Sequence, residues 1–388
     1  MRIGILRPLS SFTRLRGNRN QPLKILQIIS GRNVNGAITY CKFISEQLKA
    51  FGHEIVILCR ANGWIQENID PSIQIVESEL TRSPFELRRI ASWIRENDFD
   101  LIHTHMSRGH AFGVLMRMLT GVPVTATAHS CSFQIHWRMN DHVIANSQAT
   151  YDYHRRVNRI PAERMEKIFC FTDLERFKHV TPLKITIVKR QMRLKGDEFL
   201  CGIVGEVVQR KGHLYLFQAL EEIVKAVPNF KLVMLGRFAR EEAYVKKLRS
   251  IQKKQDLLRR VKWLGLRTNV EDFMAAFDVL AVPSIEEPLG LVALEALAAG
   301  TPVVAARTGG LPEIVRPGEN GILVPPKDPR QLAAAIIEMA KSADERKRLG
   351  ENGRAMVQTE FDPLSLTKEV EATFLRLVSE NRTKNMAA

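Results

Sequence analysis

The sequence predicts an α/β protein with two lobes, each built on a doubly wound parallel sheet, which face a central cleft. The chain has 388 residues, which is too long for one ordinary core and enough for two domains of about 150 to 200 residues each. Short apolar runs alternate with helical patterns along nearly all of it, as is typical of parallel sheets covered by helices. This alternation pauses near Phe177 and restarts at Phe199, so we expect a second lobe there.

The first lobe begins with an apolar run at 24–29 and a polar loop at 30–36 that contains glycine. A helical pattern at 38–50 and a second apolar run at 54–58 follow, which together predict a strand, loop, helix and strand. The other elements predicted in this lobe are helices at 85–97 and 110–119 and strands at 100–104, 122–128 and 142–145.

The second lobe repeats the same alternation, and two C-terminal helices at 344–359 and 363–379 follow it without another strand. We therefore expect those helices to pack across the lobes, and we expect ligands beyond the carboxyl ends of the strands. The predicted strands are 200–204, 231–235, 261–264, 279–282 and 302–306, and the predicted helices are 214–226, 241–254, 270–276, 290–299 and 329–340.

Four segments follow from this pattern. They are a basic N-terminal extension at 1–23, a Rossmann-like domain at 24–180, a second one at 181–360, and a C-terminal helix at 361–388 that returns to the first domain. No uncharged apolar stretch reaches about 18 residues and the N-terminus lacks the apolar region of a secretory signal, so we expect a cytoplasmic protein. The five cysteines contain no C-x-x-C pair, which favours reduced thiols over disulfides or zinc.

The net charge of +15 favours an anionic partner: a nucleotide diphosphate, a phosphorylated lipid, a membrane surface or a nucleic acid. The basic residues are not interleaved with stacking aromatics, so we expect no nucleic acid. Apolar positions in 85–94 and 111–119 predict possible peripheral contact with an anionic membrane. The alternative is that these are ordinary helices whose apolar faces cover the sheet.

The segment from Glu287 to Gly310 carries the clearest chemistry. A predicted strand ends in the loop that holds Glu287, and a helix opens at Gly290, where free N–H groups and the helix dipole form a site for a diphosphate. Glu295 follows eight residues after Glu287 in an apolar run, where a carboxylate is rarely buried without a partner. Two such carboxylates can accept hydrogen bonds from sugar or ribose hydroxyls. The alternative is a solvated pair beside a structural turn.

The spacing of Glu287 and Glu295 resembles the E-x7-E signature of glycosyltransferase family 4, whose members have the two-lobed GT-B fold. The resemblance continues at 312–315, 318–321 and 323–325, and more weakly from Lys24 to about Phe361. It implies a retaining hexosyltransferase that uses a UDP- or GDP-linked sugar, with no metal or other cofactor. It also implies that the first domain binds the acceptor and the second binds the nucleotide sugar.

The resemblance implies roles for four residues between Glu287 and Gly310. The position of Glu287 contacts donor-sugar hydroxyls, that of Glu295 binds the ribose, and the amides around Gly290 and Leu291 meet the distal phosphate.

Lys211 follows the predicted strand at 200–204 and opens the next helix. The resemblance implies that it binds phosphate and offsets charge on the leaving diphosphate, although a solvated lysine is the alternative. The family has arginine five residues earlier, where this chain has Glu206, and Arg210 is the candidate to supply that charge. Two further positions, Gly205 and Leu266, complete the predicted donor-binding set.

In the first lobe, Gly36 resembles one member of the family's glycine pair, where the backbone approaches the diphosphate and the acceptor. His129 ends the strand at 122–128 and matches the family's active-site histidine, which supports the transferring sugar. A structural turn and a core or surface histidine are the respective alternatives. The segment 167–177 departs from the family pattern at 170–172, in the loop that helps to form the cleft.

No metal site is expected. The D-x-D at 98–100 precedes a strand rather than following one, and His103, His105 and His110 lack a fourth ligand at zinc spacing. The predicted catalytic residues are therefore His129, Glu287 and Lys211. They would transfer a hexose to a hydroxyl of a polysaccharide, a lipid-linked glycan or a small molecule, as in cell envelope polysaccharide biosynthesis. A sugar-nucleotide 2-epimerase of the same fold and a basic nucleic-acid-binding protein are the alternatives.

Overall fold

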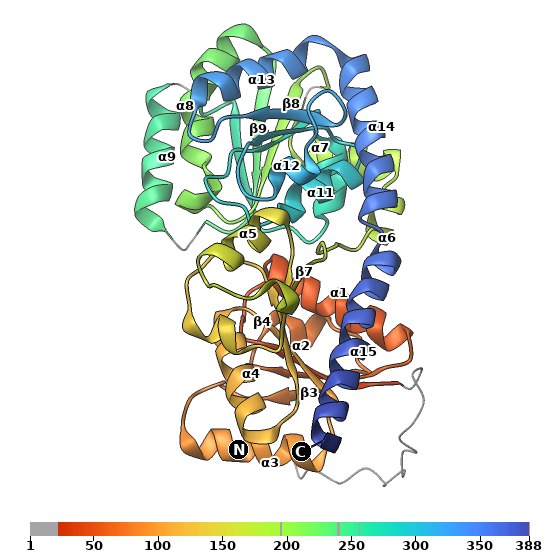
Figure 1. The fold of residues 1–388 in the computed structure, drawn as a ribbon. Helices are drawn as coiled ribbons and strands as arrows, with labels where there is room; N and C mark the ends of the chain where they lie inside the picture. The colour runs from red at the N-terminus through yellow and green to blue at the C-terminus, as the bar shows by residue number, and fades with distance from the viewer. Residues whose placement is uncertain (1–21, 195, 239–240, 256, 388) are drawn as a thin grey trace.

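The computed structural model describes residues 22–194, 196–238, 241–255 and 257–387. It consists of two α/β lobes, one above the other, joined by the chain between them and by the C-terminal helices (Figure 1). The two separate parallel sheets confirm the predicted fold class. Nearly all of the predicted N-terminal extension, residues 1–21, lies outside the described residues.

The first lobe contains a seven-stranded sheet in the order β3-β2-β1-β4-β5-β6-β7, in which every neighbouring pair is parallel. Its strands are β1 (Lys24–Ile29), β2 (Glu54–Cys59), β3 (Gln74–Glu77), β4 (Leu101–His105), β5 (Val124–Ala128), β6 (His142–Ala145) and β7 (Met165–Lys167). Its helices are α1 (Gly36–Ala50), α2 (Trp64–Asn68), α3 (Pro84–Glu96), α4 (Ser107–Thr120) and α5 (Gln148–Arg156), with the short 3-10 helices η1 (Ile135–Met139) and η2 (Ala162–Arg164).

The second lobe contains a six-stranded parallel sheet in the order β10-β9-β8-β11-β12-β13. Its strands are β8 (Phe199–Val204), β9 (Phe230–Leu235), β10 (Val261–Gly265), β11 (Val279–Val282), β12 (Val303–Ala306) and β13 (Gly321–Val324). Its helices are α8 (His213–Ala226), α9 (Glu242–Lys254), α10 (Val270–Ala276), α11 (Leu291–Ala298), α12 (Leu311–Ile314) and α13 (Pro329–Lys341), and η3 spans Gln209–Lys211. The segment between the two sheets in the sequence adds α6 (Glu175–Lys178) and α7 (Pro182–Gln191), and both pack against α10 of the second lobe.

The strand order reverses at one place in each sheet, between β1 and β4 and between β8 and β11. Ligands of doubly wound sheets bind beyond the carboxyl ends of the strands at such a switch point. In the second lobe, the loops after β8 and β11 carry Lys211 and Glu287. In the first lobe, the loop after β1 leads to Gly36. The fold therefore brings predicted site residues to both switch points.

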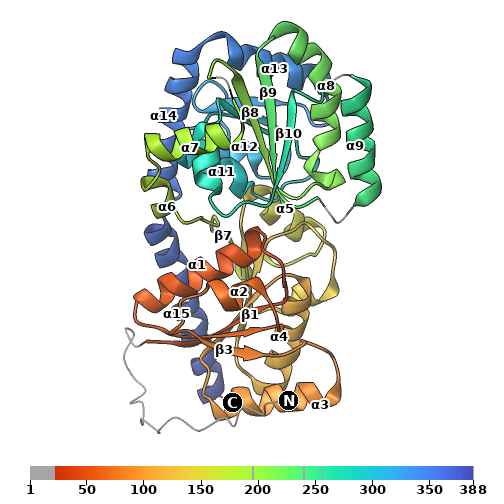
Figure 2. The ribbon, with the colours of Figure 1, turned by 180° about the vertical axis from the view of Figure 1, so that it is seen from behind.

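The two C-terminal helices cross from one lobe to the other (Figures 1 and 2). Helix α14 (Ala343–Glu360) packs against α11 of the second lobe, and α15 (Pro363–Ala387) packs against α1 of the first. Phe374 of α15 is fully buried, with its ring centroid 5.0 Å from that of His103 on β4. Glu371 pairs with His53 at 2.8 Å. As the sequence predicts, these helices tie the lobes together.

The sequence missed three strands, β3, β7 and β13, and all three form sheet edges. They are short, at four, three and four residues. An edge strand is covered on fewer sides, so its apolar pattern is weaker. The interior strands, which the sequence predicted, are almost continuously buried and apolar.

None of the helices in the described ranges is both long and apolar enough to cross a membrane.

Candidate active site

Lys211 and Glu287 form the centre of the candidate site. The Lys211 Nζ lies 2.5 Å from Glu287 Oε2, and the same oxygen accepts a hydrogen bond from Ser284 Oγ at 3.1 Å. Only 8% of the Glu287 residue surface is exposed. The two residues come from the loops after β8 and β11, on either side of the switch point, so the structure brings together two residues that lie 76 positions apart.

The backbone around Lys211 explains why glycine follows it. Gly212 has a φ of +71°, and a Cβ at this position would lie 1.8 Å from the carbonyl oxygen of Pro283. Only glycine allows both this conformation and this approach. The turn therefore holds the loop that carries Lys211 directly against the loop that carries Glu287.

Helix α11 begins next to this pair. Its N-cap, Gly290, has a φ of +105° and no side chain to cap the helix, and the first turn contains no acidic residue. The first N–H groups of a helix have no partner within the helix. Those at Leu291 and the following residue are thus available to a diphosphate, and the helix dipole favours its negative charge.

The start of α1 in the first lobe lies close to the start of α11 in the second lobe. A Cβ on Gly36 would lie 3.1 Å from Leu291 Cδ1, so the N-terminal ends of the two helices meet across the lobes. The side chain of Asn35 already accepts hydrogen bonds from the N–H groups of Ala37 and Ile38. The start of α1 thus offers fewer free donors than the start of α11, and Gly36 serves for close approach.

Glu295 is held by the chain that connects the lobes. Its Oε1 lies 2.5 Å from an Arg176 guanidinium nitrogen and 3.1 Å from Thr172 Oγ1. The carboxylate is one-fifth exposed and has the partners that its apolar surroundings require. A ribose that bound at Glu295 would have to share this carboxylate with Arg176.

The remaining donor-site positions lie at the same edge of the second sheet. Gly205 follows β8, and a Cβ there would lie 3.8 Å from Lys211 Cε. Leu266 follows β10 and is 56% exposed. Arg210 has an exposed side chain, while its carbonyl accepts the N–H of Ile285 at 2.7 Å.

His129 lies in a chain of hydrogen-bonded rings inside the first lobe. Gln27 Oε1 can only accept a hydrogen bond, so His105 donates to it from Nε2 at 3.0 Å. His105 Nδ1 must then accept the bond from His129 Nε2 at 3.1 Å. The other nitrogen of His129 lies 3.9 Å from Cys170 Sγ. Both ring nitrogens therefore face the protein.

Burial keeps several histidines neutral and makes folding stability depend on pH. It lowers the pKa values of His103, His129 and His213 from 6.5 to about 3. In the unfolded chain these groups bind protons below about pH 6.5, whereas in the folded protein they do not. Their stabilising contribution is thus present above pH 6.5 and is lost as the pH falls towards 3.

We expect the free energy of unfolding, measured by urea denaturation, to fall by about 2 kcal/mol per buried histidine between pH 7 and pH 5. The variant His103→Gln should lose less stability over the same range than the wild type, because it lacks one of these groups. Equal stability of the wild type at both pH values would contradict this result.

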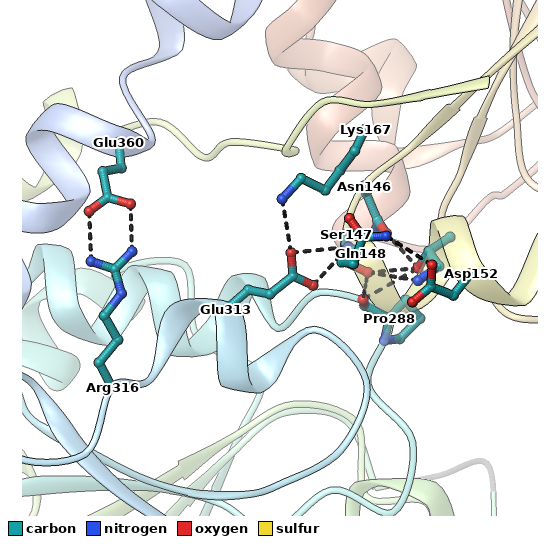
Figure 3. Close-up of polar contacts among 10 residues, drawn as sticks. Asn146, Ser147, Gln148, Asp152, Lys167, Pro288, Glu313, Arg316 and Glu360 are labelled. Carbon is teal, nitrogen blue, oxygen red and sulfur yellow. Dashed lines mark hydrogen bonds and ion pairs between the residues drawn. The ribbon is translucent and has the colours of Figure 1, made fainter. Parts of the chain in front are cut away.

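Polar contacts join the first lobe to the loop before α11 and to α12 (Figure 3). Ser147 Oγ donates to the carbonyl oxygen of Pro288 at 2.5 Å, just before α11. Both carboxylate oxygens of Glu313 accept the N–H of Gln148, at 2.8 and 3.0 Å, and Lys167 Nζ lies 3.3 Å from Glu313. A second-lobe carboxylate therefore meets the start of the first-lobe helix α5, where the helix dipole favours negative charge.

The residues that could suggest a metal have other roles in the structure. No group of three histidine, cysteine or acidic side chains suited to a metal ion occurs in the part of the chain that is described. Asp100 accepts from the N–H of Lys24 at 2.9 Å and from Arg382 at 2.7 Å. His103 bonds Thr127, and His110 bonds Thr104.

Sequence reasoning missed the partners of Glu295. Arg176 and Thr172 lie in segment 167–177, which departs from the family pattern at 170–172, but that pattern did not indicate that they would contact Glu295. Phe171 of the same segment packs on Tyr40, with ring centroids 5.3 Å apart, and Tyr40 also contacts the His129 ring at 5.5 Å. The one feature of the sequence that could have indicated a partner for Glu295 is the basic residue Arg176, which lies shortly before the second lobe.

Comparisons with known proteins agree with this architecture. Residues 34–176 match the model of Glycosyltransferase Family 4, and residues 184–356 match that of Glycosyl transferases group 1. D-inositol 3-phosphate glycosyltransferase of Corynebacterium jeikeium (strain K411) is 28% identical over 375 residues, which cover 82% of this chain and 86% of that protein. Putative glycosyltransferase EpsD of Bacillus subtilis (strain 168) is 25% identical over 353 residues, which cover 82% and 91%.

The crystal structure of Anabaena Alr3699/HepE in complex with UDP and glucose has the same fold, with a TM-score of 0.82 and 24% identity. The match covers 90% of this chain and 99% of that one. The two family models together span both lobes. The chain therefore belongs to glycosyltransferase family 4 and is a glycosyltransferase with the GT-B fold.

Proposed function

We propose that the protein transfers a hexose from a UDP- or GDP-linked sugar to a hydroxyl acceptor, with retention of the anomeric configuration and without a metal. The Lys211 and Glu287 pair beside the uncapped start of α11 is the observation that carries this proposal. A nucleoside diphosphate sugar needs a cation, free amide donors and a carboxylate, and the presence of all three side by side supports the proposal.

The diphosphate would lie at the start of α11, with Lys211 as its cationic partner. As the bond from sugar to diphosphate breaks, negative charge develops on the leaving oxygen, and the ammonium and the helix amides stabilise it. Glu287 would accept hydrogen bonds from the sugar hydroxyls, and Glu295 would do so from the ribose while Arg176 balances its charge. The lobes meet at Gly36 and Leu291, which supports catalysis by holding donor and acceptor together. We assign no protein nucleophile.

Relatives guide the choice of substrates to test. HepE is described in complex with UDP-glucose, so a UDP-linked hexose is the first donor to try. The C. jeikeium relative is named D-inositol 3-phosphate glycosyltransferase, so D-inositol 3-phosphate is one acceptor to test. We propose a glycan, a lipid-linked glycan or a small hydroxyl compound, and a place in cell envelope polysaccharide biosynthesis at the cytoplasmic side.

We also propose peripheral contact with an anionic membrane. Fewer apolar residues of α3 and α4 are exposed than the sequence suggested, so fewer residues support this contact. Most apolar residues of α3 and α4 face the sheet, including Ile90, Trp93 and Phe112. Phe85, Met118 and Leu119 are exposed in agreement with a membrane contact, at 80%, 61% and 42%. Vesicle co-sedimentation that does not increase with anionic lipid content would count against the contact.

The test of the proposed reaction is incubation with a panel of UDP- and GDP-sugars, with and without hydroxyl acceptors, followed by NMR of the product. We expect donor consumption with at least one sugar, an unchanged anomeric configuration and full activity in the presence of a chelator. Isomerised donor without acceptor would indicate the epimerase alternative. An inverted anomeric centre would reject retention, and loss of activity with chelator would reject metal independence.

A further inference from the structure

The loop from Glu287 to Gly290 is held by both lobes. Within the second lobe, the carbonyl oxygen of Glu287 accepts the N–H of Gly310 at 3.0 Å. Because Pro288 has no N–H, its backbone can form a hydrogen bond only through its carbonyl oxygen. That oxygen accepts from Ser147 Oγ at 2.5 Å, at the start of α5 in the first lobe (Figure 3). Two consecutive carbonyls beside the Glu287 side chain are thus held by different lobes.

The hydrogen bonds around Ser147 leave its hydroxyl proton for Pro288. Ser147 is fully buried and is the N-cap of α5, where its oxygen accepts the N–H of Thr150 at 3.1 Å. The Pro288 carbonyl oxygen, at 2.5 Å, is a closer acceptor for its proton than Thr150 Oγ1, at 2.9 Å. Thr150 Oγ1 lies 3.4 Å from the Pro288 oxygen but only 2.9 Å from Asn146 Oδ1, to which it donates. Ser147 is therefore the main donor to Pro288.

Two glycines allow the loop to lie this close to its neighbours. Gly309 has a φ of +54°, and a Cβ there would lie 1.8 Å from the carbonyl oxygen of Glu287. A Cβ on Gly310 would lie 2.6 Å from the carbonyl oxygen of Pro288 and 2.9 Å from Ser147 Cβ. A side chain at either position would push the loop out of place. The loop is thus packed tightly between the start of α5 and the loop after β12.

A second contact holds the start of α5 on the second lobe. Both carboxylate oxygens of Glu313 accept the N–H of Gln148, at 2.8 and 3.0 Å, and Lys167 Nζ lies 3.3 Å from the same carboxylate (Figure 3). Gln148 is the first residue of α5, so its N–H has no partner within the helix, and the helix dipole favours a negative acceptor there. Ser147 directly precedes Gln148 and is therefore held against Pro288.

We propose that Ser147 is a positioning residue for sugar transfer, which holds the Pro288 carbonyl from the first lobe and thereby sets the direction of the Glu287 carboxylate in the second. The inference rests on the proposed function, because it takes Glu287 as the contact to the donor sugar. Ser147 acts through the loop and not on the substrate. A misplacement of about 1 Å at a reacting centre can lower the rate by about 10² times, so a single hydrogen bond to this loop can matter.

The variant Ser147→Gly removes the hydroxyl and leaves most of the helix capping, because glycine replaces serine at an N-cap far better than alanine does. We expect kcat for sugar transfer to fall by about tenfold or more, with little change in the thermal unfolding midpoint. The matched control is Ser342→Gly. Ser342 is the exposed N-cap of α14, and its side chain likewise accepts the N–H three residues later, so this variant should have wild-type kinetics.

A double-mutant cycle distinguishes positioning of Glu287 from a general structural role. If Ser147 acts through Glu287, Ser147→Gly should lower kcat/KM much less in a Glu287→Gln background than in the wild type. A loss by the same factor in both backgrounds would overturn the proposal. Unchanged kcat in the single variant Ser147→Gly would overturn it as well.

Hydrogen exchange of the full chain without ligand tests the contact independently of activity. In Ser147→Gly the amides at 289–291 should exchange faster than in the wild type and in Ser342→Gly, because the loop loses its restraint from the first lobe. Faster exchange confined to α5 would show that Ser147 only caps its own helix, and would contradict the proposal.

These measurements separate the positioning role from the proposed function. If the wild type transfers no sugar from any sugar nucleotide while exchange at 289–291 depends on Ser147, the proposed function fails and the restraint on the loop stands. If the wild type transfers sugar and Ser147→Gly changes neither kcat nor exchange at 289–291, only the role of Ser147 fails.

Discussion

The variant Lys211→Ala is expected to transfer sugar with a kcat about 10² to 10³ times lower than that of the wild type. The ammonium is the cation beside Glu287 and the start of α11, where the proposed reaction would develop charge on the departing diphosphate. Its loss removes stabilisation that is larger in the transition state than in the bound donor, so kcat should fall more than the KM for the donor rises. Steady-state kinetics with the preferred sugar nucleotide measure both.

A control for charge and helix position is Lys225→Ala, an exposed lysine in the last turn of α8. It should have wild-type kinetics, and both variants should have thermal unfolding midpoints that allow assay at room temperature. A Lys211→Ala variant with unchanged kcat would show that this lysine does not assist departure of the diphosphate.

The variant Glu287→Gln should lower kcat/KM by about 10 to 100 times, because charge-assisted hydrogen bonds to sugar hydroxyls become neutral ones. Glutamine keeps the size of the side chain and can still accept from Ser284, so the loop should keep its structure. Lys211 loses its anionic partner in this variant, which adds to the effect on the diphosphate.

Deoxygenated donors identify the contact. A donor that lacks the hydroxyl held by Glu287 should have a lower kcat/KM with the wild type than the normal donor has. The substitution Glu287→Gln should lower kcat/KM for this donor only a little further, because both changes remove the same interaction. The neighbouring Glu286 is exposed, and Glu286→Gln serves as the control, with kinetics like those of the wild type. If the loss of kcat/KM caused by the variant and the loss caused by the missing hydroxyl are additive, that hydroxyl does not contact Glu287.

The fold was predictable because its interior strands are continuous buried apolar runs separated by amphipathic helices. Strand β1, for example, is buried at five of its six positions. Three of the four edge strands, β3, β7 and β13, were not predicted, whereas the fourth, β10, was. In β3 the two end residues are exposed and the two central ones only partly buried, so no strand period stands out.

The candidate site was predictable where local sequence determines local geometry. Gly290 before an apolar helix predicted an open helix start, and Gly212 after Lys211 has the turn that directs the lysine to the cleft. The partner of Glu295 was not predictable, because Arg176 lies 119 residues away and only tertiary packing brings them together. The inward orientation of His129 likewise depends on His105 and Gln27, which lie on two neighbouring strands.

A crystal structure with a bound sugar nucleotide tests the central claim most directly, because that claim concerns where the diphosphate lies. We predict that its oxygens contact Lys211 Nζ and the N–H groups at Leu291, with the sugar hydroxyls at Glu287. A diphosphate bound away from the start of α11, with the ion pair of Lys211 and Glu287 left untouched by ligand, would contradict the account.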